Sequence, residues 1–295
     1  MSELFSYSEA FSRNLGLISL DEQRRLKESL IVIAGCGGVG SAHAHTLARL
    51  GFSRFRLADP DEYGVGNFNR QIAATMNTLG RNKAEATADL IRSINPEAEI
   101  EVYQNGINGE NIASFVVDAD LVVDGIDFFC FGIRQMLFSE ARRQMTSAMT
   151  AAPLGFSGAF LHFDPQGMSF DEYFNIRQGD SYYQSMVSFI LGLSPGALHL
   201  PYMDISGVDP ETGVGPSSSV GVQMASCLLG AQAVKHLLGR PGIYCAPHYV
   251  QFDAYRLKSV SGRLYFGNRH PLQRLKRVLL KSKLRELGLD KLFSR

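Results

Sequence analysis

A glycine-rich turn between an apolar run and a helical segment is the feature that most constrains the fold. Leu30–Ala34 is uncharged and rich in β-branched residues, as expected of a strand buried on both faces. Gly-Cys-Gly-Gly-Val-Gly follows directly at 35–40, and a helical pattern then continues to about Leu50. A second strand is predicted over 55–59. This strand–helix–strand unit predicts the start of a parallel sheet.

The same alternation continues over the first 150 residues. It is typical of a doubly wound, Rossmann-like α/β fold, in which a mostly parallel sheet carries helices on both faces. Regular signals are fewer after residue 163, so we expect an irregular C-terminal region over 164–268. We predict one domain over 1–268, with a regular half at about 12–163, and a separate tail over 269–295. Further strands are predicted over 99–103, 120–124, 145–151 and 157–163, and helices over 19–28, 82–93, 130–144 and 217–238.

Composition narrows the class of protein. Of the 295 residues, 45% are hydrophobic and 20% are charged, which is typical of a globular chain and excludes a disordered or collagen-like one. The four cysteines form no Cys-x-x-Cys pair, so we expect neither a disulfide scaffold nor a cysteine-rich zinc site. The chain begins without a signal-peptide pattern and has no run of 18 apolar residues, so we expect a cytoplasmic protein without a membrane span.

The formal net charge of zero hides an uneven distribution. Residues 269–295 contain nine Lys or Arg and two Asp or Glu, a net charge of +7, which leaves −7 for the rest of the chain. Leu272, Leu275, Leu279 and Leu280 trace part of an apolar face through this tail. We expect a basic amphipathic helix that binds tRNA phosphates, an anionic membrane surface or an acidic protein, or that simply packs on the body.

The glycine turn predicts a nucleotide site. Gly35, Gly37 and Gly40 have the spacing of a loop that approaches a phosphate at a helix N-terminus. Asp59 ends the second predicted strand, 19 residues after Gly40, where a carboxylate can accept hydrogen bonds from ribose hydroxyls. The regular half is therefore the nucleotide half, and 164–268 becomes the substrate half. These residues alone do not distinguish NAD, FAD and ATP.

The residues that follow favour a triphosphate. Arg70 and Lys83 add two cations, and Asn67 and Gln71 add amide groups. A dinucleotide does not require them, because the helix N-terminus already neutralises its pyrophosphate, so these groups suit a triphosphate better. Asp127 follows the predicted strand at 120–124, at a carboxyl end of the sheet where ligands bind. Its hard oxygen suits Mg²⁺ that bridges phosphates.

In combination these motifs resemble the ThiF/MoeB/HesA family of adenylating enzymes, which are related to ubiquitin-activating enzymes. The specific part is the Asn-x-x-Arg-Gln element after an Asp-x-Asp strand end, because simple NAD-binding domains do not share it. The matching segments occur in family order and are SRN at 12–14, GCGGVG at 35–40, ADPDEYGVGNFNRQ at 58–71, GRNK at 80–83, INP at 94–96 and DLVVDGID at 120–127.

The resemblance implies that a substrate carboxylate attacks the α-phosphate of ATP and releases pyrophosphate. The expected substrates are the C-terminus of a ubiquitin-like protein or peptide, or a small carboxylate. The resemblance also implies a homodimer, because Arg13 matches an arginine that reaches into the neighbouring subunit's site. The implied roles are phosphate binding for Gly35, Gly37, Gly38 and Gly40, ribose binding for Asp59, positioning of the triphosphate for Asn67, Arg70, Gln71 and Lys83, and Mg²⁺ binding for Asp127.

Three departures from the family pattern leave alternatives open. The family's zinc-binding Cys-x-x-Cys pairs are missing, which is consistent with a zinc-free subgroup that includes enzymes acting on tRNA threonylcarbamoyladenosine. No cysteine lies between Cys130 and Cys227, so we do not expect a thioester intermediate. Phe128 follows Asp127 where the family commonly has asparagine.

The other hypotheses are a tRNA threonylcarbamoyladenosine dehydratase-like enzyme, an NAD- or FAD-dependent oxidoreductase and a non-catalytic nucleotide-binding partner.

The stretch 181–203 contains no Asp, Glu, Lys or Arg. Three interpretations are open for it: a loop that covers the substrate, an element that touches a membrane, or a buried insertion.

Overall fold

The computed structural model describes residues 5–204, 215–286 and 288. Its centre is one eight-stranded sheet with the order β3-β2-β1-β4-β5-β6-β7-β8. The strands from β3 to β5 are parallel, and β6, β7 and β8 continue the sheet in antiparallel fashion. The predicted doubly wound, mostly parallel α/β fold is therefore confirmed. Its strands are β1 (Leu30–Ala34), β2 (Arg54–Ala58), β3 (Glu99–Tyr103), β4 (Leu121–Asp124), β5 (Ala148–Leu154), β6 (Ser157–Phe163), β7 (His248–Asp253) and β8 (Lys258–Arg263).

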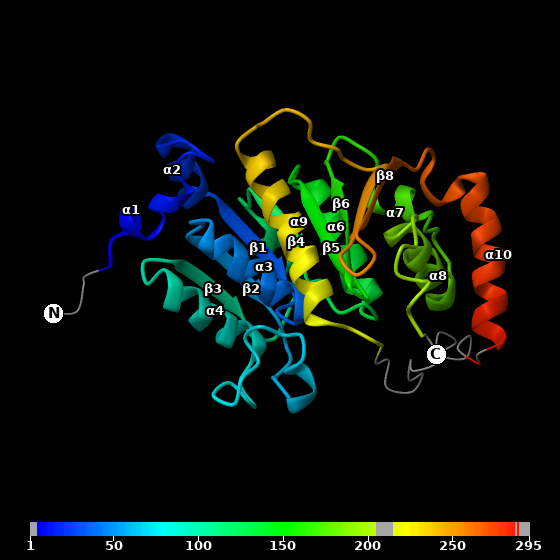
Figure 1. Ribbon diagram of the computed structural model, residues 1–295, viewed down its shortest axis with the longest axis horizontal. Coiled ribbons are helices and arrows are strands. Elements are labelled where there is room, and N and C mark those ends of the chain that lie inside the picture. Colours follow the sequence, from blue (N-terminus) through cyan, green and yellow to red (C-terminus); the bar gives the residue numbers. More distant parts are fainter. Residues whose placement is uncertain (1–4, 205–214, 287, 289–295) are drawn as a thin grey trace.

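Helices cover both faces of the sheet (Figure 1). Ile31 and Ile33 of β1 pack with α3, α4 and α9, whereas Val32 of the same strand packs with α5, α6, α7 and α8. Successive side chains of a strand point to opposite faces, so the uncharged run of β1 serves both cores. The helices are α1 (Tyr7–Ala10), α2 (Leu20–Glu28), α3 (Gly38–Arg49), α4 (Lys83–Ile94), α5 (Ile112–Val116), α6 (Phe131–Arg143), α7 (Phe170–Phe174), α8 (Tyr182–Leu193), α9 (Ser219–Leu237) and α10 (Pro271–Glu286), with short 3-10 turns at Ser12–Asn14, Val65–Asn67 and Gly267–Arg269.

The second half contains more regular structure than its sequence indicates. Most of the uncharged stretch 181–203 is α8, whose residues from Ser185 to Phe189 are all buried. The ring of Phe189 lies 5.1 Å from that of Phe174 and 5.7 Å from that of Phe131. Of the three interpretations of this stretch, the buried insertion agrees with the structure of α8. Residues 205–214, which follow it, lie outside the described part of the chain.

The predicted strand at 145–151 is displaced towards the C-terminus. Strand β5 begins at Ala148 and continues through Pro153 to Leu154. Its pairing with β4 ends at Thr150, whereas its pairing with β6 extends to Leu154. One side of β5 is thus unpaired at Pro153, and a residue without an N–H is tolerated there.

The tail helix α10 does not pack on the body through the leucines that trace its apolar face. Leu272, Leu275 and Leu279 are exposed, and the residues of α10 that are buried against the body are Gln273 and Leu284. Gln273 is buried because its Nε2 donates to the carbonyl oxygen of Leu191, 3.0 Å away. The leucine pattern correctly indicates a helix, but it does not identify the face that contacts the body.

Candidate nucleotide-binding site

The glycine turn links β1 to α3 at the carboxyl edge of the sheet. A Cβ on Gly40 would lie 1.7 Å from the carbonyl oxygen of Gly35, and a Cβ on Gly35 would lie 2.3 Å from that of Gly125. Gly35 also has φ +86°, a conformation that L side chains rarely adopt. The absence of a side chain at Gly35 and Gly40 therefore allows β1, α3 and the end of β4 to contact one another directly. Gly37 is the N-cap residue of α3 and has no side chain that would shield the helix N-terminus.

Asp59 anchors this turn. Its Oδ2 accepts from the Cys36 N–H at 2.6 Å and its Oδ1 accepts from the Asp61 N–H at 2.9 Å. Burial raises the pKa of the Asp59 carboxyl, and these two backbone hydrogen bonds oppose the rise. The sequence assigns Asp59 only to ribose binding, but the structure shows that it also fixes the path of the glycine turn.

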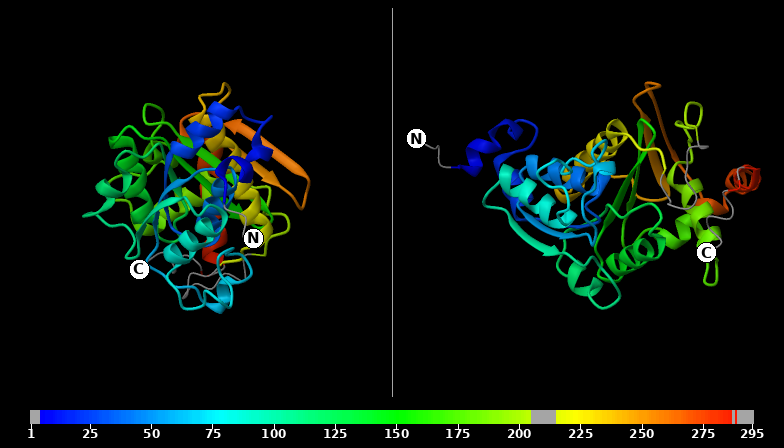
Figure 2. Two further views of the ribbon diagram at one scale, coloured as in Figure 1. Left: turned by 90° about the vertical axis from the view of Figure 1, so that its left-hand side faces the viewer. Right: turned by 90° about the horizontal axis from the view of Figure 1, so that it is seen from below.

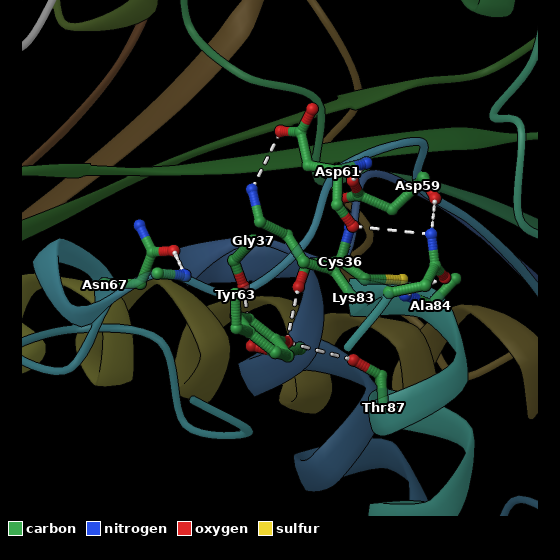
Figure 3. A network of polar contacts seen from close by, with 12 residues as sticks. Cys36, Gly37, Asp59, Asp61, Tyr63, Asn67, Lys83, Ala84 and Thr87 are labelled. Carbon is green, nitrogen blue, oxygen red and sulfur yellow. Dashed lines mark hydrogen bonds and ion pairs between the residues drawn. The ribbon is translucent and has the colours of Figure 1, made fainter. Parts of the chain in front are cut away.

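Tyr63 supports the turn from the other side. Its hydroxyl donates to the Cys36 carbonyl oxygen at 2.9 Å and lies 3.4 Å from Thr87 Oγ1 (Figure 3). Cys36 is fully buried, and burial raises the pKa of its thiol well above the ordinary value. This thiol is a small core side chain rather than a nucleophile. Sequence reasoning missed Tyr63, because a tyrosine in a loop has no distinguishing pattern.

Lys83 opens helix α4 beside the turn. Its Nζ donates to Asp61 Oδ2 at 2.8 Å (Figure 3). The lysine side chain is 11% exposed and that of Asp61 is 64% exposed, so water reaches the pair from the carboxylate side. Asn82 fixes the start of α4, because its Oδ1 accepts from the Ala84 and Glu85 N–H groups while its Nδ2 donates to the Asp59 carbonyl oxygen.

Arg70 and Gln71 lie over the glycine turn. A Cβ on Gly37 would be 3.7 Å from Gln71 Nε2, and a Cβ on Gly38 would be 3.9 Å from Arg70 Cγ. Gln71 is only 6% exposed, and its Oε1 has no hydrogen-bond partner among the described residues. A buried acceptor without a hydrogen-bond partner is costly to the fold.

Asn67 and Arg70 also shape their own segment. The Asn67 Oδ1 accepts from the Gly64 N–H at 2.9 Å, which holds the 3-10 turn at Val65–Asn67. Arg70 donates through the same Nη1 to the Gly66 carbonyl oxygen and to Asn69 Oδ1, both at 2.9 Å. In this structure Asn67 therefore positions the backbone that carries Arg70 to the glycine turn.

Asp127 lies in the exposed loop after β4. Its Oδ1 accepts from the Phe129 N–H at 2.9 Å, so one carboxylate oxygen serves the loop itself. The pKa of the neighbouring Cys130 thiol is raised, first by burial and then by the negative charges of Asp127, Asp61 and Asp59. Strands β2 and β4 are both parallel neighbours of β1, so Asp59 and Asp61 after β2 and Asp127 after β4 follow the same carboxyl edge of the sheet. Among residues 5–204, 215–286 and 288, no group of three His, Cys, Asp or Glu side chains is arranged to hold a metal ion.

A buried ion pair clamps the Asp127 loop. Arg134 Nε donates to Asp124 Oδ2 at 2.8 Å, and the side chains are only 4% and 1% exposed. The same guanidinium donates to the carbonyl oxygens of Ile126, Asp127 and Phe128, and it lies 4.7 Å from the Phe189 ring centroid. The centroid of the Phe128 ring lies 5.4 Å from that of the Phe189 ring.

Arg13 is separated from the other site residues. It is exposed, in the turn at Ser12–Asn14, and it forms no hydrogen bond or ion pair with the described residues. Its neighbour Asn14 donates to the Leu50 carbonyl oxygen at 3.2 Å, just beyond the C-terminal end of α3. The glycine turn lies at the opposite end of this helix, about 18 Å away by the rise of 1.5 Å per residue.

Comparison with curated proteins gives relatives of several activities. The chain is 31% identical over 157 residues to the sulfur carrier protein ThiS adenylyltransferase of Escherichia coli (strain K12), a match covering 52% of this chain and 62% of that protein. It is 36% identical over 127 residues to the tRNA threonylcarbamoyladenosine dehydratase of Bacillus subtilis (strain 168), covering 43% and 50%. The aligned region thus spans less than two thirds of either relative.

Solved structures and a family model extend the comparison along the chain. The crystal structure of E. coli MccB with ATP aligns with a TM-score of 0.66 and 19% identity, covering 88% of this chain and 71% of that one, which shows a common fold. The model of the ThiF family matches residues 11–274, which include the glycine turn, Asp59, Arg70, Lys83 and Asp127. Among the described residues, no helix combines the length and apolar character needed to cross a membrane. The chain belongs to the ThiF family.

Proposed function

We propose that this protein adenylates a substrate carboxylate with ATP. The observation that supports the proposal is the position of two side chains at the N-terminus of α3. Gln71 lies beside Gly37, and Arg70 lies beside Gly38. A helix N-terminus favours an anion, and Arg70 adds a cation to it. The unpartnered Gln71 Oε1 supports a ligand that also brings a hydrogen-bond donor or a water molecule.

The reaction is a displacement at phosphorus. An oxygen of the substrate carboxylate forms a bond to the α-phosphorus while the bond between this phosphorus and the bridging oxygen to the β-phosphate breaks, and pyrophosphate leaves. Negative charge grows on the phosphate oxygens during this step. Arg70 and Lys83 are cations beside the glycine turn, and we assign them to stabilising that charge. Asp59 holds the turn in place before the ligand arrives.

Asp127 would be the residue that holds a magnesium ion beside the phosphates. One of its oxygens accepts from Phe129, and Asp59 and Asp61 lie around the same end of the sheet. Magnesium needs only one or two carboxylates when substrate phosphates and water supply its other ligands. Bound there, the ion would neutralise phosphate charge, and Arg134 would keep its carboxylate ligand in position.

A C-terminal carboxylate of a peptide or ubiquitin-like protein is the substrate class that we favour. The relative from Escherichia coli is named for activating a sulfur carrier protein, and MccB has been crystallised with MccA. A small carboxylate would react by the same chemistry. The basic tail keeps a substrate on tRNA as the second candidate, because α10 presents six Lys or Arg side chains and one glutamate.

Nucleotide binding is tested first by thermal unfolding with Mg·ATP, AMP, NAD and FAD. We expect Mg·ATP to raise the melting temperature of the wild type, because a ligand that binds only the folded state stabilises it. Lys83→Ala and Arg70→Ala should lose this rise, and Lys258→Ala, at an exposed position of β8, should keep it. Stabilisation by a dinucleotide without stabilisation by ATP would overturn the proposal. Exchange of labelled pyrophosphate into ATP then identifies the substrate.

Arg13 gives a separate test of the proposed homodimer. Because it lies at the far end of α3 from its own glycine turn, we propose that it completes the site of a partner subunit. Arg13→Ala and Lys83→Ala should each be inactive alone. An equal mixture that exchanges subunits should recover about a quarter of wild-type activity, since half of the dimers would carry one intact site. No recovery, with proven subunit exchange, would place Arg13 outside the site.

A further inference from the structure

Helix α10 has an apolar stripe that faces away from the protein. Leu272, Leu275, Val278 and Leu279 are each between 59% and 66% exposed. Their spacing of three, six and seven residues places them on one side of the helix. The opposite side is packed on the body, because Gln273 donates to the Leu191 carbonyl oxygen and Leu284 is buried with Val187. The exposed stripe therefore contributes nothing to the attachment of α10.

Basic side chains border this stripe on both sides. Arg274, Lys281 and Arg285 follow one border and Lys276 and Lys283 follow the other, as the 3.6-residue period requires. Two of these cations also contact the body, because Lys276 Nζ donates to the Pro195 carbonyl oxygen at 2.8 Å and Lys281 Nζ lies 5.8 Å from the Tyr183 ring centroid. Residues 258–286 contain nine Lys or Arg and a single acidic residue, Glu286. An apolar stripe between two rows of cations is the pattern of a helix that lies in the surface of an anionic membrane.

The position of α10 fits a flat partner. The helix forms the outermost edge of the molecule at the end opposite to α1 and α2, and it projects beyond the sheet (Figures 1 and 2). A partner can reach only the outer side of α10, because the other side is already occupied by α8. Only one stripe along a convex edge remains available, and a planar surface can cover it.

Charge argues against the other occupants. A second copy of α10 would bring the basic rows of two helices together, which is unfavourable. A nucleic acid would use the cations but would leave the four apolar side chains uncovered, since phosphate binding is electrostatic. Tyr265 and Phe266, which precede the 3-10 turn at Gly267–Arg269 that leads to α10, are also exposed, and tyrosine is enriched at membrane surfaces.

We propose that α10 docks the protein on anionic lipid membranes, with Leu272, Leu275, Val278 and Leu279 in the acyl boundary and the flanking Lys and Arg among the headgroups. Attachment through this one helix is peripheral and reversible, because four side chains bury little apolar area. The proposed nucleotide site, at the carboxyl edge of the sheet, belongs to the body of the protein and takes no part in this attachment.

The test is sedimentation of the full-length protein with vesicles. Vesicles of phosphatidylcholine with about one third phosphatidylglycerol should bind the wild type, and pure phosphatidylcholine should not. Leu272→Ser with Leu279→Ser should reduce binding at least about tenfold. Arg274→Gln with Lys283→Gln should weaken binding and flatten its dependence on salt. The matched control is Leu17→Ser with Leu20→Ser, two exposed leucines at the other end of the molecule.

Each outcome decides the proposal. We expect the serine variants to keep the wild-type melting temperature, because the substituted positions are exposed. An unchanged melting temperature then establishes that the loss of binding comes from the changed surface and not from unfolding. The absence of wild-type binding to the anionic vesicles would overturn the proposal. Equal binding by the wild type and the leucine variant would also overturn it, because charge alone would then be responsible. Binding of tRNA that is insensitive to the leucine changes, without vesicle binding, would assign α10 to RNA.

Discussion

His43 offers a quantitative test of how the core beneath the glycine turn is built. The residue lies in α3, five positions after Gly38, and is fully buried. Neither ring nitrogen has a hydrogen-bond partner among the described residues. Burial lowers the pKa of the imidazole from 6.5 to about 3, because the charged ring would lose its hydration, and the Ala151 backbone opposes this shift only in part. The folded protein therefore keeps His43 neutral at a pH where the unfolded chain protonates it.

The sign of the effect follows from proton binding. Well above pH 6.5 the imidazole is neutral in both states, so its ionisation makes no contribution to the free energy of unfolding. Between 6.5 and about 3 the unfolded chain binds a proton that the folded protein does not, so stability decreases as pH decreases. At about 1.4 kcal/mol per pH unit, the loss from this one residue reaches about 2 kcal/mol at pH 5.

The assay compares wild type with His43→Met in urea-induced unfolding at pH 7.5, 6 and 5. Methionine fills a similar volume without a titratable group. We expect the variant to gain about 2 kcal/mol relative to wild type between pH 7.5 and 5. His162 and His199, whose pKa values burial lowers to about 4, are present in both proteins and cancel in the difference. A difference that stays within about 0.5 kcal/mol across the range would refute the reasoning.

Three further predictions concern the frame of the site and use urea-induced unfolding and circular dichroism. Gly40→Ala should prevent native folding, because its Cβ would lie 1.7 Å from a carbonyl oxygen, whereas Gly38→Ala should fold, because its nearest contact is an ordinary 3.5 Å. Arg134→Met should cost about 3–5 kcal/mol by leaving Asp124 charged and buried, and adding Asp124→Leu should recover part of that loss. Asn82→Ala should cost about 1–2 kcal/mol through loss of the α4 cap.

The first half of the fold could be predicted because its local signals agree with one another. The uncharged run of β1 meets the glycine turn, and Ser19 with Glu22 forms the capping box that begins α2. Parallel strands place their carboxyl ends at one edge. Residues as far apart in the chain as Asp59 and Asp127 could therefore be assigned to one site from the sequence alone.

The rest depends on tertiary partners that have no pattern in the sequence. Arg134 and Asp124 each look like ordinary charged residues, and only the packing of α8 makes their ion pair a buried one. Gln273 is buried in α10 because a backbone carbonyl of α8 lies opposite to it, whereas more apolar neighbours remain exposed. Local patterns indicate that a helix forms, but the side it buries depends on contacts far along the chain.

On the proposed assignment of Lys83 to the triphosphate, its pairing with Asp61 makes nucleotide binding an exchange of anions. The lysine already has a counter-ion, so a phosphate must replace a carboxylate instead of filling an empty place. Asp61 is 64% exposed, and water can solvate it as soon as the lysine turns away. The released carboxylate then stands next to a polyanion, with no cation of its own. Any positive ion that enters this space becomes more strongly held, and by thermodynamic reciprocity the nucleotide does too.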